Sequence, residues 1–201
     1  MDIENIVHLG VFDLNLAVLP GEKIPLHIFE PRYKQLIADC KTSDSPFCVP
    51  VKGKKGDDSL ACVVKIKSVD EVLEDGRMNI TVEGTGLARA VSPFENPVSL
   101  YNEIQAEMLE LQENRQATAG LRIRFNNYCA ALEVADLFPS DAPLSIYEIA
   151  NSIGLSNRQK KRFLKARNAG DVQENILLNH LNMSRIIMMQ EEKVIDGLIL
   201  N

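Results

Sequence analysis

The side chains that could carry chemistry are scattered along this sequence rather than grouped in a catalytic pattern. Nucleophilic catalysis requires a Ser or Cys beside a base, but the sequence has no G-x-S-x-G elbow, no S-x-x-K motif and no His near a Cys or Ser in a recognisable pattern. The acidic pairs Asp57-Asp58 and Glu191-Glu192 lie in polar stretches, where solvation explains them better than acid–base catalysis does. We therefore expect no catalytic residues and no enzymatic activity.

Phosphate and metal sites are also poorly supported. Gly53-Lys54-Lys55-Gly56 lacks the following Ser or Thr and a helix start, and Gly84-Thr85-Gly86 lacks a third glycine, so both are predicted to be turns rather than phosphate-binding loops. The histidines lie far apart, and no C-x-x-C pair occurs among the cysteines, which are Cys40, Cys48, Cys62 and Cys129. We expect no cofactor, no metal site and reduced thiols.

The composition is that of an ordinary globular protein. The chain has 201 residues, of which 45% are hydrophobic and 25% charged, which excludes disordered and fibrous classes. A net charge of -6 disfavours a uniformly basic nucleic-acid binder but allows a local basic patch. Residues 1–20 contain no Lys or Arg, and no apolar stretch reaches the roughly 18 residues of a membrane span, so we expect a cytoplasmic protein without a membrane partner.

The first half of the chain has the patterns of strands. Pro20-Gly21 and Asp75-Gly76 are turn signals, and Pro31 suits the first position of a single helix whose apolar positions have helical spacing. The β-rich runs between these signals are Ile3 to Leu19, Phe47 to Lys52, Ala61 to Val72, Met78 to Val82 and Glu103 to Leu111.

The second half has the patterns of helices. Leu121, Phe125, Tyr128 and Leu132 indicate one amphipathic helix that ends before Pro139. Further helix starts are predicted by Ser145-x-x-Glu148, Ser156-x-x-Gln159 and Asp171-x-x-Glu174, and Gly154 fits the end of the first of these. We therefore divide the chain into a β-rich subdomain, 1–113, and a helical subdomain, 114–201.

Two surfaces of the helical half could bind partners. The segment from Ile146 to Phe163 resembles a helix-turn-helix, although Lys160 falls where that motif has an apolar residue. A capped helix pair with one solvated basic face is the favoured interpretation, and phosphate binding is the alternative, for a patch of Arg158, Lys160, Lys161, Arg162 and Lys165. The last helix is rich in Met and Leu, which is typical of a core or an oligomer interface and less often of an adaptable binding surface.

A family resemblance appears in the run VLPGEKIPLHIFEPRY, from Val18 to Tyr33. This run is similar to the N-terminal substrate-binding domain of the ATP-dependent Lon protease, which also occurs as a stand-alone protein. The helical half has a similar layout, and the family's second motif stretch resembles Asp75-Gly76-Arg77, Val82-Glu83-Gly84 and Arg89. The chain departs from the family at Ala61-Cys62, where Gly-Thr is usual, and at Leu87, which replaces a common arginine.

The resemblance implies an α+β fold, with a PUA-like β-barrel subdomain followed by a helical bundle. It also implies a polypeptide-binding role for Phe29, Arg32 and Tyr33, but structural roles are favoured. Phe29 and Tyr33 are expected to be core anchors, and Arg32 is expected to pair with Glu30 or Glu83.

Two functional hypotheses follow. The first is a non-enzymatic module that binds unfolded or apolar polypeptide segments, as an adaptor in protein quality control or as a partner of a separate ATPase or protease. It is motivated by the resemblance and by the absence of a Walker motif and a Ser-Lys protease domain. The second is a nucleic-acid binder that uses the basic helix 158–167.

Overall fold

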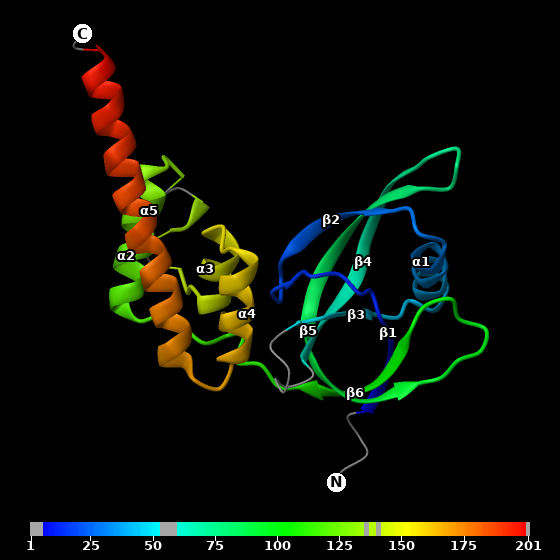
Figure 1. Cartoon of the computed structure of the whole chain (residues 1–201). Coiled ribbons are helices and arrows are strands. Elements are labelled where there is room, and N and C mark those ends of the chain that lie inside the picture. The colour runs from blue at the N-terminus through cyan, green and yellow to red at the C-terminus, as the bar shows by residue number, and fades with distance from the viewer. Residues whose placement is uncertain (1–5, 53–59, 135–136, 140–141, 200–201) are drawn as a thin grey trace. The chain divides into compact units, whose positions relative to one another are not determined.

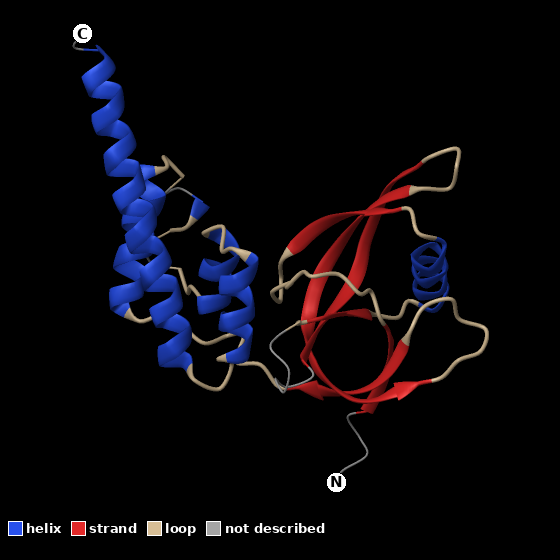
Figure 2. Ribbon diagram, viewed as in Figure 1, coloured by secondary structure: helices blue, strands red, loops and turns tan. Residues whose placement is uncertain are grey.

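The computed structural model describes residues 6–52, 60–134, 137–139 and 142–199, with only the helical backbone for 191–199. The chain forms two compact units, Met1–Leu111 and Gln112–Asn201. The first unit consists of strands and one helix, and the second consists of helices (Figures 1 and 2). The predicted α+β class is confirmed.

The first unit is built on a six-stranded antiparallel sheet. The strand order is β1-β6-β5-β4-β3, and β2 also pairs with β5. The sheet is strongly curved in Figure 2, and Val11, just after β1, forms a parallel bridge with Cys48 of β3. The elements are β1 Ile6–Gly10, β2 Lys23–Ile28, α1 Pro31–Ser43, β3 Phe47–Pro50, β4 Leu60–Val72, β5 Met78–Phe94 and β6 Glu103–Leu109.

Strand β5 organises this sheet because it pairs with three others. It is 17 residues long; its first part pairs with both β2 and β4, and its last part pairs with β6. The prediction of a strand over Met78 to Val82 is therefore too short, and the predicted turn at Gly84-Thr85-Gly86 is wrong, because both glycines lie inside β5. The other predicted glycine turn, Gly53 to Gly56, lies outside the described residues.

Gly84 is required because no side chain fits between β5 and the backbone of Leu19, and not because its backbone has a positive φ angle. A Cβ atom there would lie 2.2 Å from the carbonyl oxygen of Leu19. The Gly84 N–H donates to Glu22 O, and the Gly21 N–H donates to Gly84 O, each at 2.9 Å. The missing side chain thus lets the segment before β2 lie directly on β5.

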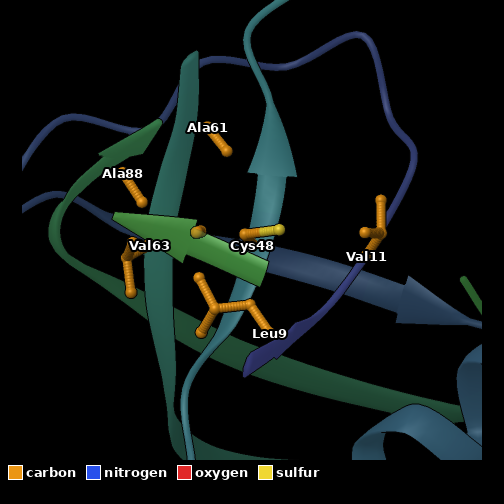
Figure 3. Packing of buried hydrophobic residues seen from close by; sticks show 7 residues of the cluster. Leu9, Val11, Cys48, Ala61, Val63 and Ala88 are labelled. Atoms are coloured by element: carbon orange, nitrogen blue, oxygen red, sulfur yellow. The ribbon is translucent and has the colours of Figure 1, made fainter. Parts of the chain in front are cut away.

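Small and branched apolar residues fill one core of the sheet unit. Figure 3 shows side chains of this cluster, which is made of Leu9, Val11, Cys48, Ala61, Val63, Ala88 and Ala106. Helix α1 has Pro31 in its first turn, as predicted, and it buries Tyr33, Leu36, Ile37 and Cys40.

The described part of the second unit contains four α-helices, which are α2 Ala119–Ala131, α3 Ile146–Ser152, α4 Asn157–Lys165 and α5 Gly170–Ile199. Both predicted capping boxes, at Ser145 and Ser156, are present. The predicted cap at Asp171 is wrong, because α5 begins at Gly170 and Asp171 lies in its first turn. Among the helices that the structure describes, none is long and apolar enough to cross a membrane.

A buried carboxylate links α2 to α5. Glu174 is 7% exposed. It accepts a hydrogen bond at 2.7 Å from the hydroxyl of Thr118, the residue that caps α2, and lies 3.5 Å from an Arg115 nitrogen. Glu174 therefore connects the two helices instead of completing a cap with Asp171.

Candidate functional site

Phe29 lies at the corner between β2 and α1 and faces solvent. Its side chain is 58% exposed, and its ring stacks on that of His27, with 6.1 Å between ring centroids. His27 Nδ1 is 2.7 Å from Asn79 Oδ1, and Asn79 in turn donates to Glu71 at 2.7 Å. The predicted role of Phe29 as a core anchor is therefore wrong, because the chain turns after Ile28 and leaves the ring outside.

Tyr33, in contrast, is a core anchor as predicted. It is 3% exposed, and its ring lies 4.2 Å from that of Phe12. Its hydroxyl oxygen accepts a hydrogen bond from the Asp13 N–H at 3.1 Å. The helical spacing of α1 decides this difference, since Tyr33 points inward with Leu36 and Ile37.

Arg32 is held on the surface over the ring of Tyr33. Its guanidinium pairs with Glu30 at 2.9 Å and lies 4.4 Å from the centre of the Tyr33 ring. The hydrogen bond to Glu30 raises the pKa of Arg32, which remains charged. The first predicted partner, Glu30, is thus confirmed, whereas Glu83 pairs with Lys67 at 3.0 Å. Phe29 and Arg32 are both accessible, and the buried Tyr33 ring supports the Arg32 guanidinium. We call Phe29, Glu30 and Arg32 the motif corner.

The strand that leads into this corner has one edge without a partner strand in the described part of the sheet. Among the described strands, β2 pairs only with β5, from Lys23↔Glu83 to Ile28↔Met78. Since the Glu22 carbonyl accepts from Gly84, the alternation of an antiparallel ladder turns the backbone groups of residues 23, 25 and 27 outward. Pro25 lacks an N–H at the middle of this edge, a feature that limits pairing with another chain.

The structure brings four of the five predicted basic residues together. At 100° per residue, Arg158, Lys161, Arg162 and Lys165 fall within one third of the circumference of α4. Lys160 lies on the other side, between the directions of the buried Phe163 and Leu164. This confirms a capped helix pair with one basic face and removes Lys160 from that face.

A pocket of about 310 Å³ lies between α2 and α5. Its apolar lining consists of Tyr128, Ala131, Leu181, Met188 and Met189, and its polar lining of Arg124, Asn127, Asn182 and Arg185. Arg124 donates a hydrogen bond to Asn182. We call this the α2–α5 pocket. The Met and Leu pattern of the last helix predicted one apolar wall of this pocket. The sequence did not predict that Arg124 and Arg185 line the same pocket, because they are about 60 residues apart in the chain.

The described residues form no metal-binding cluster and contain no activated cysteine. No group of three His, Cys, Asp or Glu side chains within the described part of the chain could hold a metal ion. All four cysteines are free and buried. Burial raises the pKa of Cys40 and Cys129, and raises that of Cys48 to about 12, so these thiols stay protonated at neutral pH and are poor nucleophiles.

The comparison with protein families decides the identity. The family model described as the ATP-dependent protease La (LON) substrate-binding domain matches residues 8–177. The chain belongs to this family. The match covers most of both units, and the comparison detects the Lon substrate-binding domain alone, with no ATPase or protease domain.

Two solved structures of Lon N-terminal domains share the fold. The Lon N-terminal domain protein from Xanthomonas campestris has 20% sequence identity and a TM-score of 0.60, over 80% of this chain and 91% of that one. The N-terminal domain of the Mycobacterium avium complex Lon protease has 16% identity and a TM-score of 0.60, over 88% of this chain and 98% of that one. A search of curated proteins found no match.

The two departures of this Lon-family chain from the motif lie together. Cys62 of β4 is the cross-strand partner of Leu87 of β5, and both are fully buried. The Cys62 sulfur accepts a hydrogen bond from the Val18 N–H at 3.4 Å. The changes therefore affect the interior beneath the motif run and leave the motif corner on the surface unaltered.

Proposed function

We propose that this chain is a non-enzymatic module that recognises unfolded or apolar polypeptide segments, with the motif corner as a contact site. The observation that carries the proposal is the match of residues 8–177 to the Lon substrate-binding domain. The geometry supports a direct role for Phe29, because an aromatic ring that is 58% exposed can bury apolar surface only when a partner covers it.

Arg32 complements Phe29 in this proposal. It is three residues further along the chain, is held by Glu30, and can donate to carbonyl oxygens of a bound segment while Phe29 packs on the side chains of that segment. Such contacts do not depend on a particular residue sequence. They suit a module that binds many polypeptides.

The proposal is tested by fluorescence anisotropy of a labelled, permanently unfolded polypeptide titrated with the protein. Phe29→Ala is expected to weaken binding by roughly tenfold, since truncating a well-packed aromatic anchor costs more than about 1 kcal/mol. The matched control is Val91→Ala, which shortens another exposed apolar side chain on the same sheet. Equal affinities of the two variants and the unchanged protein would remove the motif corner from the site, and no saturable binding would refute the function itself.

The cellular role in the proposal is that of an adaptor in protein quality control, in the cytoplasm, acting with a separate ATPase or protease. The matched family supports this role, because it is described as the substrate-binding domain of an ATP-dependent protease. We also infer that the curved sheet closes as the PUA-like barrel of the family, which is supported by the Val11–Cys48 bridge and by the hydrogen bond from the Phe12 N–H to Cys48 O at 2.8 Å.

A second candidate function, nucleic-acid binding, is favoured by the basic face of α4. Four positive side chains on one arc could contact neighbouring phosphates. In that case Lys161→Gln lowers the slope of log affinity against log salt by about one, whereas Lys160→Gln, off the face, changes it less. A flat salt response of RNA or DNA binding would refute this candidate.

A further inference from the structure

The α2–α5 pocket combines an adaptable apolar lining with positive charge. Its two methionines, Met188 and Met189, are flexible and can repack around different apolar side chains. Arg124 comes from α2 and Arg185 from α5, so a guanidinium is contributed by each wall. No acidic side chain lines the pocket within the described part of the chain, although the whole chain has a net charge of -6.

The part of α5 that lines this pocket is also apolar on its other faces, and the described part of the second unit leaves these faces exposed. On α5, Met183 is 59% exposed, Ile186 49% and Ile187 51%. On α2, Ile123 is 60% exposed. A helix that is apolar on nearly every side is normally covered by other structure, so the part of α5 from Leu181 to Met189 is expected to have a partner.

We propose that the α2–α5 pocket binds an amphipathic polypeptide segment that carries apolar side chains together with Glu or Asp. A pocket of about 310 Å³ is at the lower end of the range for ligand sites, and it accommodates a few apolar side chains rather than a folded domain. Carboxylates beside those side chains would meet Arg124 and Arg185, which act as charge-assisted donors. Net apolar burial supplies affinity, and the two guanidiniums select acidic over basic segments.

This inference rests on the proposed function, because it names the class of polypeptide preferred at a second site. It also assigns the helical unit a binding role that is separate from the motif corner. Charge complementarity favours a polypeptide of opposite sign over a second copy of this chain, in which the same two arginines would be presented again.

The test uses two labelled helical peptides of about 14 residues, or four turns, each with Leu at every third or fourth position. One peptide carries Glu at the remaining positions and the other carries Lys. Fluorescence anisotropy with the whole chain should give about tenfold tighter binding of the Glu peptide. The preference should disappear in the double variant Arg124→Gln, Arg185→Gln. It should persist in the control Arg158→Gln, Arg162→Gln, which removes the same charge from α4.

Equal binding of the two peptides, or equal loss of the preference in both double variants, would overturn the pocket assignment. So would a stable dimer of the chain that no longer binds the Glu peptide, because a second copy would then occupy the surface. The unfolded polypeptide, titrated in parallel, separates this failure from failure of the proposed function. If the unfolded polypeptide binds but the Glu and Lys peptides bind equally, only the pocket assignment fails. If neither the unfolded polypeptide nor either peptide binds, both proposals fail.

Discussion

Replacing Gly84 by alanine tests how the motif run is held on the sheet. A Cβ atom at this position would lie 2.2 Å from Leu19 O, 2.9 Å from Leu19 C and 3.2 Å from Val18 Cγ1. Two of these neighbours are backbone atoms, which cannot rotate away as a flexible side chain can. The segment before β2 must therefore move off β5.

The destabilisation has two sources, broken hydrogen bonds and overpacking. Moving the segment breaks or lengthens two backbone hydrogen bonds, those between Gly84 and Glu22 and between Gly21 and Gly84, at about 1 kcal/mol each. Overpacking in a filled interior adds about 1–3 kcal/mol. We expect Gly84→Ala to lower the free energy of unfolding of the sheet unit by roughly 3–5 kcal/mol.

Gly86→Ala is the matched control in the same strand. A Cβ atom there meets only Met108 Cε, at the ordinary contact distance of 3.5 Å, so this substitution should be nearly neutral. The assay is urea unfolding followed by circular dichroism, with hydrogen exchange in β5 identifying the transition of the sheet unit. A destabilisation below about 1 kcal/mol for Gly84→Ala, or equal effects of the two substitutions, would refute the steric argument.

Three further predictions concern the interior and the division of the chain. Burial raises the pKa of Cys48 to about 12, whereas an ordinary thiol has a pKa of about 8.5. At a pH between these two values, the Cys48 thiol stays protonated in the folded state and is deprotonated in the unfolded state. The free energy of unfolding should thus fall as pH rises above about 9, by at most about 1.4 kcal/mol per pH unit, and urea titrations of Cys48→Ala should show a smaller fall. Glu174→Ala should lower the free energy of unfolding by about 1–3 kcal/mol, measured by thermal unfolding, because it leaves the Thr118 hydroxyl without its acceptor. Glu174→Gln should lower this free energy less. Equal effects of the two substitutions would argue against the hydrogen bond as the cause. Expressed alone, fragments 1–113 and 114–201 should keep the circular dichroism of a sheet and of a helical bundle respectively, and an unfolded fragment would show that the units depend on each other.

The elements that the sequence predicted well depend on local interactions. Pro31 begins α1, and the Ser145 and Ser156 capping boxes begin α3 and α4, because each signal acts within one helical turn. The family was also identifiable from the run Val18 to Tyr33, since its residue order is a local property. The start of α5 was predicted to within one residue, but Asp171 lies in its first turn and Glu174 accepts from Thr118, 56 residues away.

The accessible site residues were decided by contacts between distant segments. Helical spacing predicted the inward direction of Tyr33, which packs against Phe12, but no local pattern showed that the turn after β2 exposes Phe29. Gly84 resembled a turn residue until β2 and its preceding segment were placed on β5.

The two binding surfaces of the helical unit show the same division. The basic charges of α4 and the unusual position of Lys160 were evident in the sequence, and the structure shows that Lys160 lies between the directions of the buried Phe163 and Leu164. The α2–α5 pocket needed tertiary structure altogether, because Arg124 and Arg185 meet through the packing of two helices that are separated in the chain by α3 and α4. Local hydrogen bonds and side-chain spacing are encoded within a few residues, whereas exposure and the convergence of charges depend on which surfaces the folded core leaves uncovered.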